Sequence, residues 1–200
     1  MGKVVKDAMI LTVITLISGC LLGLVYEITK DPIARAQEAA QQRAYQAVFA
    51  EADSFEALAD FPEEGIASED GEVTINNVVT ALDGTGNILG YVMTTTSHSG
   101  YGGDITLAVG ITNDGTVNGY SITSISETAG LGMKATEENF YSQFEGKTAE
   151  AFEVVKGTAT ADNQIEAISG ATITSSAVTD AVNESLTYFR ELAEGGSANE

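Results

Sequence analysis

Hydrophobic and polar positions divide the chain into an apolar beginning, an acidic middle and a β-branched second half. Residues 8–26 carry no charged side chain, and an apolar run of about 19–22 residues is long enough to cross the hydrocarbon core of a bilayer. We therefore expect a transmembrane helix over about residues 8–28. After Asp31-Pro32, the Ala- and Gln-rich residues 33–52 predict a separate juxtamembrane helix. The acidic segment 53–71 contains Pro62, Gly65 and Gly71 and predicts a loop or a partly ordered connection.

The next part of the chain has the pattern of β-hairpins. Residues 72–82 and 88–97 are β-branched runs on either side of Asp83-Gly84-Thr85-Gly86-Asn87. Residues 104–112 and 116–126 flank Asn113-Asp114-Gly115 in the same way. An Asp-Gly turn between two such runs indicates an antiparallel hairpin. A short helix over residues 137–144 and a strand over 152–155 are expected to follow.

A second helix is predicted near the C-terminus, after a β-branched run at residues 164–168. Five apolar residues recur at helical spacing and share one face: Val178, Ala181, Val182, Leu186 and Phe189. Four hydroxyl residues crowd the helix start: Ser169, Thr172, Thr174 and Ser175. These hydroxyls could cap the free N–H groups, and a helix N-terminus could also hold a phosphate. The residues alone leave both interpretations open.

Together these elements predict an α+β fold, with one N-terminal transmembrane helix and a domain of antiparallel strands with flanking helices. The expected division is residues 1–30 as membrane anchor, 31–71 as juxtamembrane helix and acidic connection, 72–193 as the folded domain and 194–200 as a flexible tail.

Charge and composition exclude several functions. The chain has 9 basic and 29 acidic residues, a net charge of −20, whereas a protein that binds nucleic acid needs clustered Lys and Arg. The single Cys20 forms no internal disulfide, and with His98 as the only histidine the chain cannot assemble a zinc or iron–sulfur ligand set. His98 could act as a general base or be a solvated surface residue. The sequence shows no nucleophile–base triad.

Cys20 raises an alternative for the N-terminal segment. Ile17-Ser18-Gly19-Cys20 fits a lipoprotein processing site, at which Cys20 would be lipidated. The apolar run continues beyond Cys20, however, which favours an uncleaved anchor. Basic residues flank both ends of the run, so charge does not decide its orientation.

The residues Ser-Gly-Ala-Thr-Ile-Thr at 169–174 resemble the flavinylation motif of the FMN-binding domain family, Asp-x-x-(Ser/Thr)-Gly-Ala-(Ser/Thr)-x-Thr. The leading acid of the motif falls at Glu166, which is one methylene longer than Asp. The resemblance implies that Thr174 carries FMN through a phosphoester and that a flavin transferase installs it.

Two Gly-rich loops also resemble loops of that family, and they are expected to border the flavin. One is Glu127-Thr128-Ala129-Gly130-Leu131-Gly132, in which Ala129 replaces the family's proline, and the other is Gly100-Tyr101-Gly102-Gly103. The FMN-binding residues implied in this way are Thr174, Ser169, Gly170, Ala171, Thr172, Glu127, Thr128, Gly130, Leu131, Gly132 and Tyr101.

The whole plan, an anchor followed by this domain, resembles the family of G subunits of Rnf-type ion-translocating ferredoxin:NAD oxidoreductase complexes. That resemblance implies an electron-transfer subunit in the cell membrane, with its domain on the extracytoplasmic side and other redox subunits and membrane lipid as partners. The C subunits of sodium-pumping NADH:quinone reductases share the same plan. A membrane-anchored binding module without redox activity is the alternative from a different class.

Overall fold

The structure, a computed structural model, describes residues 2–59 and 61–196 of the chain. It forms two compact units, one within residues 1–40 and the other within residues 41–200.

The first helix, α1 (Gly2–Val48), is a single element of 47 residues. Both segments predicted to be helical are helical, but they form one element, because α1 continues through Pro32. A proline inside a helix removes one backbone hydrogen bond and can kink the helix, and good helix formers after it favour continuation. The alanines of residues 34–44 provide that propensity here. By length and composition, α1 is suited to cross a membrane.

The second unit is built on an antiparallel sheet, whose order is β1-β3-β4-β5-β6, with β2 also paired to β3. Both predicted hairpins are confirmed by β3 (Val73–Leu82) with β4 (Ile88–Ser97) and by β5 (Ile105–Thr112) with β6 (Val117–Ser124). The segment predicted to be a loop or a partly ordered connection, residues 53–71, contains two short strands. This segment contributes β1 (Ser54–Ala57) and β2 (Ile66–Ala67), which pair with β3. Strands this short are stabilised by pairing with another strand, here β3. A local sequence pattern does not reveal such a partner.

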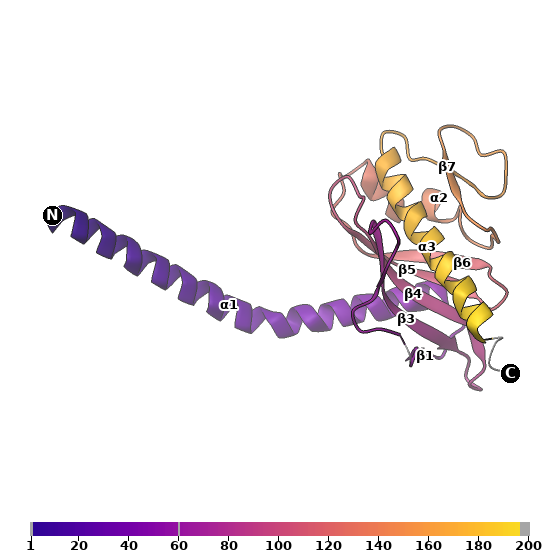
Figure 1. Ribbon diagram of the computed structural model, residues 1–200, viewed down its shortest axis with the longest axis horizontal. Coiled ribbons are helices and arrows are strands. Elements are labelled where there is room, and N and C mark those ends of the chain that lie inside the picture. The colour runs from indigo at the N-terminus through magenta and orange to yellow at the C-terminus, as the bar shows by residue number, and fades with distance from the viewer. Residues whose placement is uncertain (1, 60, 197–200) are drawn as a thin grey trace. The chain divides into compact units, whose positions relative to one another are not determined.

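One face of the sheet is covered by the C-terminal helix α3 (Thr172–Gly196), which crosses the strands in Figure 1. Its predicted apolar face is confirmed, since the five apolar residues predicted to share that face are all buried: Val178, Ala181, Val182, Leu186 and Phe189. Smaller elements complete this layer, namely η1 (Gly132–Thr136), α2 (Glu138–Tyr141) and a parallel pair of β7 (Glu153–Val155) and β8 (Gln164–Glu166). The predicted short helix is thus limited to α2, and β7–β8 is an exception to the antiparallel expectation.

The other face of the sheet packs against the last turns of α1. Tyr45, Val48 and Phe49 are buried there with apolar residues of β3, β4 and β5. A Cβ at Gly90 would lie 2.7 Å from Cζ of Phe49, and one at Gly110 would lie 2.9 Å from Cβ of Val48. Position 110 must therefore lack a side chain for α1 to approach, while at position 90 the Ile111 carbonyl of the neighbouring strand excludes a side chain together with Phe49. The end of the predicted juxtamembrane helix is part of the domain's core.

The predicted domain bounds at residues 30, 71 and 193 stay predictions. Helix α3 extends to Gly196, and residues 197–200 of the predicted tail lie outside the described residues.

The exposed side of α3 carries acidic residues whose charge the fold disfavours. Burial raises the pKa of the half-buried Glu184, and the carboxylates of Asp70, Glu191 and Glu69 raise it further. Burial, with a smaller contribution from Asp70, also raises the pKa of Asp180. A pKa raised by folding means that the group contributes stability while it is protonated. That contribution is lost as the pH rises through the folded-state pKa.

We therefore expect Glu184→Gln to stabilise the domain at pH 7. Because the side chain remains partly solvated, the gain in unfolding free energy should be below about 1 kcal/mol. It should disappear near pH 4, where the carboxyl is protonated. Denaturant titrations at both pH values test this, with the exposed strand residue Glu153 changed to Gln as control. A gain that is the same at both pH values would contradict the electrostatic cause.

Candidate functional site

A cleft of about 610 Å³ opens beside the start of α3. Three separate stretches of the chain form it: the loop after β4, the loop before η1 and the first turn of α3. Its lining residues are Tyr101, Glu127, Thr128, Leu131, Gly132, Gly170, Ala171, Thr172, Ile173 and Thr174. All of these except Ile173 are among the residues predicted to bind a cofactor. The structure therefore brings together nearly the whole predicted set.

The start of α3 is held by a serine that uses both of its hydrogen-bonding functions. The hydroxyl of Ser175 accepts a hydrogen bond from the Ile168 N–H at 2.9 Å and donates one to the Ala171 carbonyl, also at 2.9 Å. The first-turn amides of an α-helix have no acceptor within the helix. In α3 those amides belong to residues 172–174, which line the cleft. This end of the cleft is suited to an anion.

Thr174 lies close to the backbone of Gly132, at the start of η1. Its side chain is only 1% exposed, yet it borders the cleft. A Cβ at Gly132 would lie 2.7 Å from Oγ1 of Thr174 and 2.6 Å from Oε2 of Glu127. Only glycine fits at position 132 without a shift of these groups. The absence of a side chain at Gly132 thus allows the Thr174 hydroxyl and the Glu127 carboxylate both to lie next to its Cα.

Glu127 joins the two Gly-rich loops. It is 9% exposed, and its Oε1 accepts a hydrogen bond from the Gly102 N–H at 3.2 Å. Within residues 2–59 and 61–196, no Lys, Arg or His lies at ion-pairing distance from this carboxylate. The sequence placed both loops at one site but gave no sign of the hydrogen bond that connects them.

The rim of the cleft is apolar and open to solvent. Tyr101, Leu131 and Ile173 are 72%, 42% and 54% exposed. Exposed apolar and aromatic side chains around a cleft suit a flat aromatic ligand. Sequence reasoning did not select Ile173, although it occupies the variable position of the motif directly before Thr174.

Two predicted site residues do not line the cleft. Gly130 lies in the Glu127 loop with a φ of +77°. Ser169 borders a separate groove together with Glu166, the leading acid of the motif. The Glu166 carboxylate accepts a hydrogen bond from the Ala159 N–H at 2.9 Å. This bond joins the loop between β7 and β8 to the end of β8.

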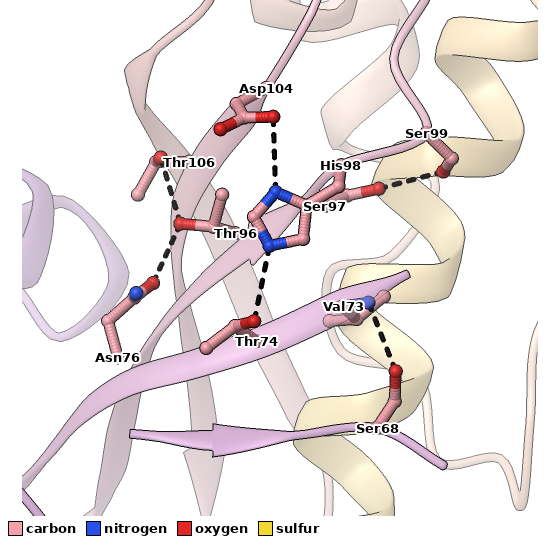
Figure 2. A network of polar contacts seen from close by, with 10 residues as sticks. All are labelled: Ser68, Val73, Thr74, Asn76, Thr96, Ser97, His98, Ser99, Asp104 and Thr106. Carbon is pink, nitrogen blue, oxygen red and sulfur yellow. Dashed lines mark hydrogen bonds and ion pairs between the residues drawn. The ribbon is translucent and has the colours of Figure 1, made fainter. Parts of the chain in front are cut away.

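His98 also lies outside the cleft. Figure 2 shows its ring between Thr74 and Asp104, with Nδ1 at 3.1 Å from Asp104 Oδ1 and Nε2 at 3.2 Å from Thr74 Oγ1. The residue is exposed, and its contacts close the base of the loop that carries Tyr101. In the described part of the chain, no three His, Cys, Asp or Glu residues are grouped so that they could hold a metal ion.

A helix start suited to an anion, a buried hydroxyl and an apolar rim on an antiparallel sheet are typical of a domain that binds a nucleotide-type cofactor. The same chain carries a helix long and apolar enough to cross a membrane. A family model described as an FMN-binding domain matches residues 100–187, and one described as the RnfG N-terminal region matches residues 1–48.

Relatives cover almost the whole chain. The G subunit of the Na⁺-translocating ferredoxin:NAD⁺ oxidoreductase complex of Acetobacterium woodii is 38% identical over 95% of this chain and 93% of its own. The corresponding G subunit of the proton-translocating ferredoxin:NAD⁺ oxidoreductase complex of Clostridium ljungdahlii is 37% identical over 88% and 86%. The chain belongs to this family of G subunits, and its folded part is an FMN-binding domain.

The crystal structure of Shewanella oneidensis NqrC has the same fold. It superposes with a TM-score of 0.51 at 19% identity, covering 74% of this chain and 73% of that chain. The predicted α+β class is thereby confirmed, and the similarity at this level of identity concerns the fold alone.

The contact at Gly132 predicts a specific loss in Gly132→Ala. The new methyl group would collide with Glu127 and Thr174, which should cost about 1–3 kcal/mol of stability and reduce the FMN content. Gly130→Ala is the matched control, because its positive φ is unfavourable for alanine while nothing lies within 4 Å of the new Cβ. It should lose about 1 kcal/mol of stability but keep its FMN. Thermal unfolding and flavin absorbance measure the two effects. Equal FMN content in both variants would contradict a tight contact at Gly132.

Proposed function

We propose that the chain is the G subunit of a membrane-bound, ion-translocating ferredoxin:NAD oxidoreductase, and that it relays electrons through an FMN attached by a phosphoester to Thr174. The observation that carries the proposal is the position of Thr174, which ends the flavinylation motif and borders the cleft formed by the other motif residues. The chain is then one part of a larger oxidoreductase.

The cleft fits FMN in size and chemistry. Its volume of about 610 Å³ lies within the range of small-molecule sites. The first turn of α3 would hold the phosphate, and Tyr101, Leu131 and Ile173 would contact the isoalloxazine ring. When bound, FMN supplies the redox chemistry, while the protein holds it and tunes its potential. The net charge of −20 should disfavour the anionic reduced flavin and so lower that potential.

Among the hydroxyls at the helix start, the flavinylation motif selects Thr174 as the attachment point. The Ser175 hydroxyl is already used by Ile168 and Ala171. Thr172 lines the cleft and is half-buried, so it serves as the matched control. A flavin transferase would approach Thr174 through the cleft.

The partners of the chain follow from its two parts. Helix α1 would lie in the membrane lipid of the cell, and the FMN-binding domain would face the extracytoplasmic side and exchange electrons with other subunits. The two named relatives differ in the ion they translocate, so family membership does not select sodium or protons. The alternative of an NADH:quinone reductase C subunit has support only from the fold, at 19% identity.

Thr174→Ala should give a folded chain that carries no covalent flavin, because the attacking hydroxyl is lost while the core is unchanged. Thr174→Ser should keep part of the flavin, and Thr172→Ala should still carry covalent flavin, because the hydroxyl of Thr174 remains. The measurement is intact mass spectrometry of chains produced together with a flavin transferase, supported by flavin fluorescence of the denatured protein. An FMN adduct on Thr174→Ala would move the attachment to another residue.

The full chain should stay with membranes at high salt and dissolve only in detergent, because α1 is held by apolar burial. Cys20→Ser should behave identically, whereas its release into solution would favour the lipoprotein alternative.

An exposed cysteine added to this variant by Glu56→Cys should react with an impermeant maleimide in intact cells whose outer layers admit the reagent. Labelling only after lysis would place the domain on the cytoplasmic side.

A further inference from the structure

We propose that Glu127 is the general base that accepts the proton of the Thr174 hydroxyl while FMN is transferred to it. The acceptor chain would then supply part of the catalytic machinery for its own modification. This inference rests on the proposed attachment of FMN to Thr174.

The burial of Glu127 is the first observation that points to chemistry. Among the acidic residues in the described part of the chain, it alone is buried. No cation of that part forms an ion pair with it. No cation therefore neutralises this carboxylate, and its only hydrogen bond in that part of the chain is the one from the Gly102 N–H. It is also the only carboxylate among the residues that line the cleft.

The orientation of the carboxylate is the second observation. The Gly102 N–H holds Oε1 at 3.2 Å, which leaves Oε2 on the side of Gly132. The ideal Cβ position of Gly132 lies 2.6 Å from Oε2 and 2.7 Å from Oγ1 of Thr174. The two oxygens are therefore separated by no more than the sum of these distances. A general base acts through a direct hydrogen bond or through one water, and such contacts often tighten only when the substrate is bound.

Other groups are less suited to the same task. His98 does not line the cleft, and Figure 2 shows its ring engaged by Asp104 and Thr74. Tyr101 is 72% exposed at the rim. The Ser175 hydroxyl already accepts the Ile168 N–H and donates to the Ala171 carbonyl, and a neutral hydroxyl accepts a proton far less readily than a carboxylate does. Glu127 and Thr174 form the pair of base and nucleophile that the cleft provides.

The step balances with flavin adenine dinucleotide as the co-reactant. Oγ1 of Thr174 attacks the phosphorus on the flavin side of the pyrophosphate, and an O–P bond forms there. The bond from this phosphorus to the bridging oxygen breaks, and adenosine monophosphate leaves with that oxygen. The proton of the hydroxyl passes to Oε2 of Glu127 and then to solvent or to the departing phosphate. No electrons are exchanged with an outside oxidant or reductant.

The test uses the full chain in detergent, produced without a flavin transferase, and then mixed with excess purified transferase and flavin adenine dinucleotide. Intact mass spectrometry follows the covalent adduct during a single turnover. General-base catalysis contributes a factor of about 10²–10⁴, so Glu127→Ala and Glu127→Gln should react at least about 100-fold more slowly. Glu145→Gln, a change of an exposed acid outside the cleft, should react at the parent's rate.

Formate separates a chemical role from a structural one. Formate should restore at least about tenfold of the rate in Glu127→Ala, because a small carboxylate can occupy the vacated space and accept the proton. It should not restore Glu127→Gln, whose amide fills that space, and it should leave the parent unaffected. Circular dichroism checks that all the variants are folded.

Either of two results would overturn the proposal: a parent-like rate in Glu127→Ala or Glu127→Gln, or a slow Glu127→Ala that formate does not accelerate. A parent chain that gains no adduct, or an adduct on Thr174→Ala, would instead refute the attachment at Thr174. The failure of one proposal is thus distinguishable from the failure of the other.

Discussion

The cleft depends on one close approach, that of the Gly132 backbone to the first turn of α3. A side chain at Gly132 would displace both the Thr174 hydroxyl and the Glu127 carboxylate. Without it, the loop before η1 can lie directly over the start of the helix, and its apolar Leu131 reaches the rim. Glu127 also accepts a hydrogen bond from the Gly102 N–H. The loop that contains Tyr101 is therefore held at the same place. Three segments that are distant in sequence are thereby held around one hydroxyl.

The sheet gives this contact a firm base. Helix α3 begins at the cleft and then runs over the strands, where its apolar face is buried and its Ser185 hydroxyl bonds that of Thr95 at 2.9 Å. Thr174 is therefore carried by an element that the core fixes, rather than by a loop that moves independently. On the opposite face, Tyr45, Val48 and Phe49 cover the strands. Sites supported in this way are held more accurately than sites made only of loops.

The cleft differs from the surface of the domain in its charged groups. Acidic residues are spread over the surface of the domain, and Glu127 alone among those described is buried. Its place in the cleft sets it apart from acids such as Glu184, whose partly buried carboxylate only costs stability at neutral pH. The one histidine is likewise engaged at the base of a loop and not in the cleft. The reactive groups of the cleft are thus few: one carboxylate and the hydroxyls of the helix start.

The sequence by itself determined the features that depend on near neighbours. Turn residues specified both hairpins, the helical period specified the buried face of α3, and the motif at residues 169–174 specified which hydroxyl to examine. Only the tertiary structure decided that α1 continues through Pro32, that β1 and β2 join the edge of the sheet, and that Ile173 lines the cleft while Ser169 does not. The hydrogen bond from Gly102 to Glu127 and the collision that excludes a side chain at Gly132 belong to the same group. Each of these features depends on contacts between segments far apart in the chain, and residue order alone carries no distance between such segments.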